Sequence, residues 1–156
     1  MVTPFFTNGC LREQLVYPDT AVEDDTTDRK LVGLLELCDL SGLVERCGGL
    51  GGEDVTNWYS QLSPGEQQRV AWARLLYHNP RLAFLDEATS AVSEDLECAM
   101  YKGAKEMGIT LVSVWHRGSL RQFHQKVLSL GKCGRSRMQG VDSYNSMQSL
   151  VVENTT

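Results

Sequence analysis

The amino-acid sequence predicts an α/β protein built on a parallel sheet, and two observations lead to this prediction. Two short apolar runs, 82–85 and 109–114, have the length and composition of strands buried in a sheet. Each run follows a stretch with helical periodicity, at 63–78 and 94–107. Helices that alternate with buried strands indicate a parallel sheet with helices on its faces.

The helix at 63–78 carries clear signals at both ends. Ser63 stands at the N-cap position, Pro64 at the first helical position and Glu66 where a capping-box partner belongs. The helix is expected to end near His78, because Pro80 disfavours helical backbone in the residue before it. The strand that follows has no polar break, which is typical of a strand buried on both faces.

Polar groups at the ends of these two elements suggest chemistry. A helix N-terminus with the Ser63 hydroxyl and the close-approach glycine Gly65 is an anion site. Asp86 and Glu87 follow the strand, where open α/β sheets place ligands, and adjacent carboxylates can hold Mg²⁺ and polarise a water. An anion site beside a metal site suggests a nucleoside triphosphate. The alternative is a capped helix that leads into a core strand, with the acids solvated.

Before this stretch the sequence predicts two helices separated by an acidic loop. A short helix is expected at 11–17, ended by Pro18, and an amphipathic helix at 29–40. Residues 19–28 hold five acids and no base, so we expect a solvated loop there. The segment 57–59 is expected to pack against the start of the capped helix.

After Glu87 the sequence predicts a cap, a histidine near the carboxylates and a weakly ordered end. Ser93 can cap the helix at 94–107. His116 follows the strand at 109–114, so strand order places it at the same sheet edge as the carboxylates. A last strand is expected at 127–130 and a solvated loop at 131–140. The polar tail 141–156 is expected to be poorly packed, with a short helix around 143–151 as the alternative. The other two histidines, His78 and His124, are read as structural or surface residues.

Composition limits the class of protein. A chain of 156 residues with 42% apolar content can form one domain, and a net charge of −5 gives no reason to expect nucleic acid as a partner. The five cysteines show no metal or disulfide spacing, which favours reduced thiols. We find no signal peptide and no apolar run long enough to span a bilayer. The glycine-rich stretch at 48–52 lacks the Lys-Ser/Thr of a phosphate-binding loop, so we expect a flexible loop.

Several motifs in a fixed order resemble one family over residues 4 to 131. LSPGE resembles the signature motif of ATP-binding-cassette (ABC) ATPases, LAFLDEATS resembles their Walker B strand running into the D-loop, and SVWHR resembles the switch-histidine strand. PFFTNGCLREQLVYP and NWYSQLSPGE are similar to subfamily D half-transporters. The resemblance implies a P-loop NTPase-like ABC ATPase fold. Residues 1–140 would be part of a nucleotide-binding domain, with a helical signature region at about 11–80, a core at 81–131 and a C-terminal tail at 141–156.

The resemblance also implies roles for individual residues. In dimers of such domains, ATP lies between the Walker A and B motifs of one subunit and the signature motif of the other. Asp86 would hold Mg²⁺ through water, Glu87 would orient or activate the attacking water, and His116 would contact the γ-phosphate. Three residues would face the ATP of the opposing subunit: Ser63, Gly65 and Glu66.

The departures from the family pattern leave two functions open. The sequence contains no G-x-x-x-x-G-K-[ST] motif, and Val2 stands where the family has the Q-loop glutamine. The sheet would then be incomplete, with an exposed edge and face, and we expect the chain to be inactive alone. The first function is part of a transporter ATPase, with ATP and Mg²⁺ as cofactors. Its partners would be a second nucleotide-binding domain and a transmembrane domain, at the cytosolic face of a lysosomal, endoplasmic reticulum or peroxisomal membrane. Cobalamin is one candidate cargo, and the sequence alone does not identify the transported substrate. The alternative is a non-catalytic truncated isoform, or a partial gene model, that can only contribute a signature face to a partner subunit.

Overall fold

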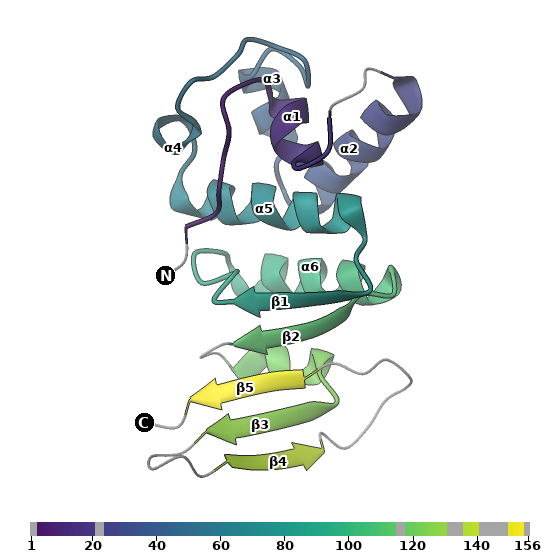
Figure 1. The fold of residues 1–156 in the computed structure, drawn as a ribbon, viewed down its shortest axis with the longest axis vertical. Helices are drawn as coiled ribbons and strands as arrows, with labels where there is room; N and C mark the ends of the chain where they lie inside the picture. Colours follow the sequence, from purple (N-terminus) through teal and green to yellow (C-terminus); the bar gives the residue numbers. More distant parts are fainter. Residues whose placement is uncertain (1–2, 21–23, 115–117, 131–135, 141–149, 155–156) are drawn as a thin grey trace.

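A computed structural model of the chain describes residues 3–20, 24–114, 118–130, 136–140 and 150–154 (Figure 1). Its elements, in chain order, are α1 (Leu11–Val16), α2 (Asp25–Leu37), α3 (Ser41–Arg46), α4 (Trp58–Gln61), α5 (Pro64–His78), β1 (Leu82–Asp86), α6 (Glu94–Glu106), β2 (Thr110–Val114), the 3₁₀ helix η1 (Gly118–Phe123), β3 (Lys126–Leu130), β4 (Ser136–Gly140) and β5 (Leu150–Asn154).

Helix α5 separates a helical region from a sheet. Helices α1 to α4 gather on one side of it, and the five-stranded sheet lies on the other side, with α6 behind β1 and β2 in the view of Figure 1. The strand order is β1-β2-β5-β3-β4. All neighbouring pairs are parallel except β3 with β4. The predicted α/β class with a parallel sheet is therefore confirmed.

The ends of α5 form as the local sequence predicts. The Ser63 side chain accepts from the Glu66 backbone amide, and the Glu66 carboxylate accepts from the Ser63 backbone amide, which completes the capping box. The helix ends at Asn79, whose φ of 43° lies in the left-handed region used by helix C-caps. Helix α1 is likewise confirmed, and Trp58, buried beside the start of α5, donates its indole N–H to the Gly9 carbonyl at 3.1 Å.

The prediction that the strand at 82–85 is buried on both faces is wrong. Ala83 and Leu85 are buried, whereas Leu82 is 49% exposed and Phe84 is 76% exposed. β1 is the end strand of the sheet that the described residues form, and these residues cover its outer face only in part. Burial of a strand depends on its neighbours, which the composition of the strand does not reveal.

The acidic segment is partly helical, which also contradicts the prediction. α2 begins at Asp25, so the expected loop at 19–28 is too long and the expected helix at 29–40 starts too late. Asp24 is the N-cap, and its carboxylate accepts from the amides of the next two threonines, Thr26 and Thr27, at 2.9 Å each. Acidic side chains are favourable in the first turn of a helix because they complement its dipole.

Two more strands form where the sequence predicts a loop and a frayed tail. Residues 136–140 pair with β3 as β4, and residues 150–154 lie as β5 between β2 and β3. The predictions for 131–135 and 141–149 fall outside the described residues. Ser93 does occupy the N-cap of α6, but its side chain makes no capping hydrogen bond. No helix in the described part of the chain is long and apolar enough to cross a membrane.

Candidate functional site

The candidate site lies where the first turn of α5 meets the segment that follows β1. A cavity of about 320 Å³ lies beside this contact, and residues of both segments line it. From the helix side come Ser63, Gly65 and Arg69, and from the other side come Ala91 and Ser93. Two motifs that are more than twenty residues apart in the sequence therefore share one concave surface.

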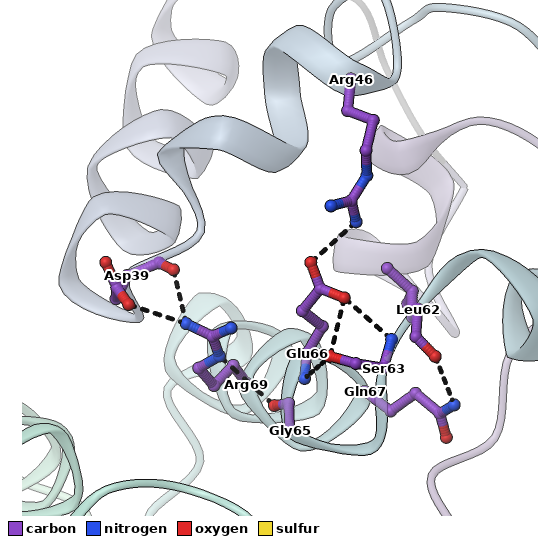
Figure 2. Close-up of polar contacts among 8 residues, drawn as sticks. All are labelled: Asp39, Arg46, Leu62, Ser63, Gly65, Glu66, Gln67 and Arg69. Atoms are coloured by element: carbon purple, nitrogen blue, oxygen red, sulfur yellow. Dashed lines mark hydrogen bonds and ion pairs between the residues drawn. The ribbon is translucent and has the colours of Figure 1, made fainter.

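The Ser63 hydroxyl is held in place by a carboxylate. It donates to Glu66 Oε2 at 2.8 Å, and Arg46 of α3 donates to the other carboxylate oxygen of Glu66, also at 2.8 Å (Figure 2). Burial raises the pKa of Glu66, but the hydrogen bonds from the Ser63 backbone and from Arg46 outweigh it, so the pKa of this carboxyl is lowered. The first turn of α5 thus presents an ordered hydroxyl beside a carboxylate that Arg46 neutralises.

Gly65 is the point of closest approach between the two sides. A Cβ atom built at this position would lie 2.9 Å from the Ala91 carbonyl oxygen, closer than real Cβ atoms come to other atoms. Only glycine lets the backbone after β1 approach the helix this closely. The sequence predicts that Gly65 allows the close approach of an anion; the close approach found here is that of the protein's own backbone, and the role toward an anion stays a prediction.

Arg69 is a residue of this site that sequence reasoning missed. Its guanidinium donates to the backbone carbonyl of Asp39 at 2.6 Å and to the Asp39 carboxylate at 2.9 Å, so it ties α5 to the end of α2 (Figure 2). Asp39 has a φ of 54°, in the left-handed region. A cation spaced six residues after Ser63 was visible in the sequence, but the partner that orients it lies thirty residues away.

Gln68 is the second residue that sequence reasoning missed. Its side chain is buried and forms hydrogen bonds with three residues of the segment after β1: the Glu87 carbonyl, the Ser90 hydroxyl and the Ala91 amide. The signal available in the sequence was Gln68 itself, four residues before Trp72 on the buried stripe of α5. A buried amide must find hydrogen-bond partners.

The two carboxylates stand at the carboxyl end of β1, as expected. Asp86 is exposed and lines a second cavity of about 330 Å³. Glu87 has a φ of 48°, which is rare for a residue with a side chain, and its amide donates to the Val114 carbonyl at 3.1 Å. In β2, Val114 pairs with Asp86, so the two strands end together. His116 itself lies outside the described residues, as does Val2.

These carboxylates suit a magnesium ion. Mg²⁺ is usually held by one or two carboxylates, with water and phosphate oxygens as the other ligands. Asp86 and Glu87 supply this donor set at an accessible position. No group of three or more His, Cys, Asp or Glu side chains in the described residues is arranged to hold a metal ion by itself.

Comparison with known proteins defines the class. Residues 9–90 match the ABC transporter family, and the chain belongs to that family. Its fold resembles a bacterial Atm1-family ABC exporter with ATP bound, at a TM-score of 0.64 and 23% identity over 81% of this chain and 22% of that one. This likeness supports the P-loop NTPase-like ABC ATPase fold that the motifs imply.

Several similar curated proteins belong to subfamily D. The mouse lysosomal cobalamin transporter ABCD4 is 49% identical over 130 residues, and its human counterpart is 48% identical over 137 residues. These matches cover 81% and 86% of this chain and 22% of each relative. Rat ATP-binding cassette sub-family D member 3 is 43% identical over 81% of this chain and 19% of its own length. The chain therefore spans about a fifth of the length of the curated relatives it matches.

Proposed function

We propose that this chain is the part of a subfamily D half-transporter that carries the ABC signature and the Walker B motif, and that it acts in coupling ATP hydrolysis to transport. One observation carries the proposal. The first turn of α5 and the backbone after β1 line a single cavity and touch at Gly65 and Ala91. A displacement of the signature motif can then shift the carboxylates of the same subunit.

The residues at the end of β1 would perform the chemistry on the subunit's own nucleotide. A magnesium ion, when bound through water to Asp86, would neutralise charge on the phosphates. Glu87 would orient the attacking water by accepting a hydrogen bond from it. His116 would contact the γ-phosphate, since it follows the strand that ends beside Asp86.

The first turn of α5 would serve the nucleotide of the opposing subunit. Backbone amides at the helix N-terminus and the Ser63 hydroxyl suit a phosphate, and Gly65 in the same turn adds no side chain beside them. Glu66 would act through Ser63, because its carboxylate accepts a hydrogen bond from the Ser63 hydroxyl. ATP binding at this face needs a second nucleotide-binding domain, so a dimer of half-transporters is the proposed assembly.

The proposed cargo and membrane are based on the names of the similar proteins. Two similar proteins are named lysosomal cobalamin transporters, so we propose cobalamin as the cargo and the cytosolic face of the lysosomal membrane as the location. The transmembrane domain would lie outside the 156 residues. We propose the division into a helical signature region at about 11–80, a core at 81–131 and a C-terminal tail at 141–156 on the same basis.

The proposal predicts different effects for the two carboxylates. In a chimera, residues 3–130 replace the stretch they match in the mouse transporter, so that the host supplies the residue at position 2. Glu87→Gln should lower kcat for ATP hydrolysis by about a hundredfold or more while ATP still binds, because the amide keeps the shape but loses the charge that orients water. Asp86→Asn should instead weaken the binding of MgATP itself. Steady-state hydrolysis and calorimetric titration measure the two effects.

The same experiment separates the alternative role. A chain that only offers its signature face to a partner would leave hydrolysis of the chimera unchanged in Glu87→Gln, while Ser63→Arg would still block it. The Walker B assignment of residues 82–87 would be wrong if Glu87→Gln hydrolysed ATP normally and Asp86→Asn bound MgATP normally.

A further inference from the structure

The side-chain amide of Gln68 is fully engaged with the segment after β1, which we call the 87–91 turn. Its Nε2 donates to the Glu87 carbonyl at 3.3 Å and to the Ser90 hydroxyl at 2.9 Å, and its Oε1 accepts from the Ala91 amide at 2.9 Å. The side chain is only 5% exposed, so water does not compete well for these bonds. A single residue of α5 therefore fixes both ends of the turn.

The 87–91 turn is held at further points, which makes its geometry specific. Gly65, one turn before Gln68 on α5, leaves room for the Ala91 carbonyl. On the other side, the Thr89 hydroxyl donates to the carboxylate of Glu97, a buried residue of α6. The turn is thus held by contacts with both α5 and α6, and of these contacts the one from Gln68 reaches Glu87 itself.

Glu87 adopts a backbone conformation that needs such support. Its φ of 48° costs free energy for a residue with a Cβ, and it persists only where the surroundings hold it. The Glu87 amide is held by the Val114 carbonyl of β2, and the Glu87 carbonyl is held by Gln68. The backbone conformation sets the direction in which the Glu87 carboxylate leaves the chain.

We propose that Gln68 is a positioning residue that sets the orientation of Glu87 from the signature helix, so that a displacement of α5 is transmitted to the carboxylate that orients water. The inference rests on the proposed function of Glu87. Gln68 does not touch the nucleotide in this scheme and acts only through the 87–91 turn. A phosphate bound at the first turn of α5 would then affect the orientation of Glu87 through α5 and the side-chain amide of Gln68.

The first test uses the full chain and nuclear magnetic resonance. Gln68→Met keeps the size of the side chain and removes all three hydrogen bonds. We expect amide exchange at Ala91 to become about fivefold faster or more, and the amide-to-Cα proton coupling of Glu87, which reports its φ, to change. Gln67→Met is the matched control, because Gln67 is also buried and its amide donates to the Leu62 carbonyl at 2.9 Å, away from the turn. The control should leave both signals of the turn unchanged.

A second variant protects the test against a loss of folding. Gln68→Glu keeps the length and the acceptor for the Ala91 amide but loses the donors to Glu87 and Ser90. Exchange at Ala91 should remain slow, while the coupling of Glu87 changes. An unchanged Glu87 coupling in both Gln68 variants would overturn the proposal.

The chimera supplies the kinetic readout. Both Gln68 variants should lower kcat for ATP hydrolysis about tenfold or more with KM for ATP changed less than about twofold, because ground-state binding is untouched. Gln67→Met should match the unsubstituted chimera. A changed Glu87 coupling with normal kcat would also overturn the proposal.

If the unsubstituted chimera shows no hydrolysis that depends on Glu87, the proposed function fails, whereas the Glu87 coupling in the chain still decides whether Gln68 sets the orientation.

Discussion

Glu87 shows how a single residue can carry both strain and function. Its left-handed backbone would relax in an unsupported turn, yet the Val114 carbonyl and the Gln68 amide hold the two sides of the residue. Asp86, directly before it, needs no such support because it ends a regular strand. The two adjacent carboxylates are therefore placed by different devices, one by the sheet and one by a side chain of α5.

Two serines at helix N-caps allow a test at the residue scale. Ser63 accepts a hydrogen bond from the Glu66 amide, whereas Ser93 occupies the N-cap of α6 without a side-chain bond. Ser63→Ala should lower the free energy of unfolding by about 1 kcal/mol, since it leaves a helix amide without its cap. Urea unfolding followed by circular dichroism measures the change.

Ser93→Ala is the matched control and should cost little. Equal losses of stability in the two variants would show that the Ser63 hydroxyl contributes nothing specific to the stability of α5. The comparison also separates the structural role of Ser63 from its proposed role toward phosphate, because it needs no nucleotide.

The residues of the site were predictable where the signal is local. Ser63 and Glu66 follow from cap rules within four positions, and the structure bears out the capping box that they form. Gln68 and Arg69 were missed because their partners lie far away in sequence, on the 87–91 turn and at the end of α2. Helical periodicity predicts which side of a helix a side chain lies on, but it does not predict which distant group will form a hydrogen bond with that side chain.

The same distinction holds for whole elements. α5 was predicted because its cap, its apolar stripe and its stop signal all lie inside the element. β4 and β5 were missed because their polar or mixed sequences form strands only through pairing with β3 and β2. The start of α2 was missed because acids favour both a solvated loop and a first helical turn.

A buried polar chain joins three elements below the site. The Tyr101 hydroxyl of α6 lies 3.2 Å from the Ser113 hydroxyl of β2, and Ser113 lies 3.0 Å from Nε2 of His124, just after η1. The other ring nitrogen of His124 lies 2.9 Å from the Leu120 carbonyl. With Nδ1 as the donor to that carbonyl, Nε2 accepts from Ser113 and the ring is neutral. The expectation of a structural role for His124 agrees with these contacts.

This arrangement predicts how stability depends on pH. Burial lowers the pKa of His124, and nearby Lys105 adds to the effect, although the bond to the Leu120 carbonyl opposes it. The folded state therefore binds a proton less readily than the unfolded chain, in which histidine has a pKa of about 6.5. The contribution to stability is complete above that pH and is lost as the pH falls, by up to about 1.4 kcal/mol per pH unit for one proton.

Urea unfolding at pH 7.5 and 5.5 tests the linkage. His124→Gln should be less stable at the higher pH but should lose less stability between the two values, because its amide does not titrate. His78→Gln is the control, since His78 is only half-buried. An equal loss of stability in His124→Gln and the unsubstituted chain would exclude His124 as the source of the pH dependence.

At the scale of the whole molecule, the outer face of β1 carries two exposed large apolar side chains, and Phe84 is the more exposed of the two. Phe84 lines the 330 Å³ cavity together with Trp72, Leu75 and Pro4, so its exposed ring continues into an apolar hollow. An end strand with exposed apolar side chains invites pairing with another chain. The resemblance to ABC ATPases implied an exposed edge and face, and the described residues show both at β1.

The exposed face predicts that the chain associates when it is expressed alone. We expect a size that grows with protein concentration, together with dye binding, because exposed apolar surface favours association. Phe84→Lys should reduce both association and dye binding, because a charge on an end strand opposes strand pairing. Met138→Lys is the control: Met138 is also exposed on an end strand, β4, but does not line the apolar cavity. Light scattering and analytical ultracentrifugation measure the size. A monomer with a sharp melt at every concentration would show that the face of β1 does not drive association, and an equal gain from Met138→Lys would attribute the effect to net charge rather than to this face.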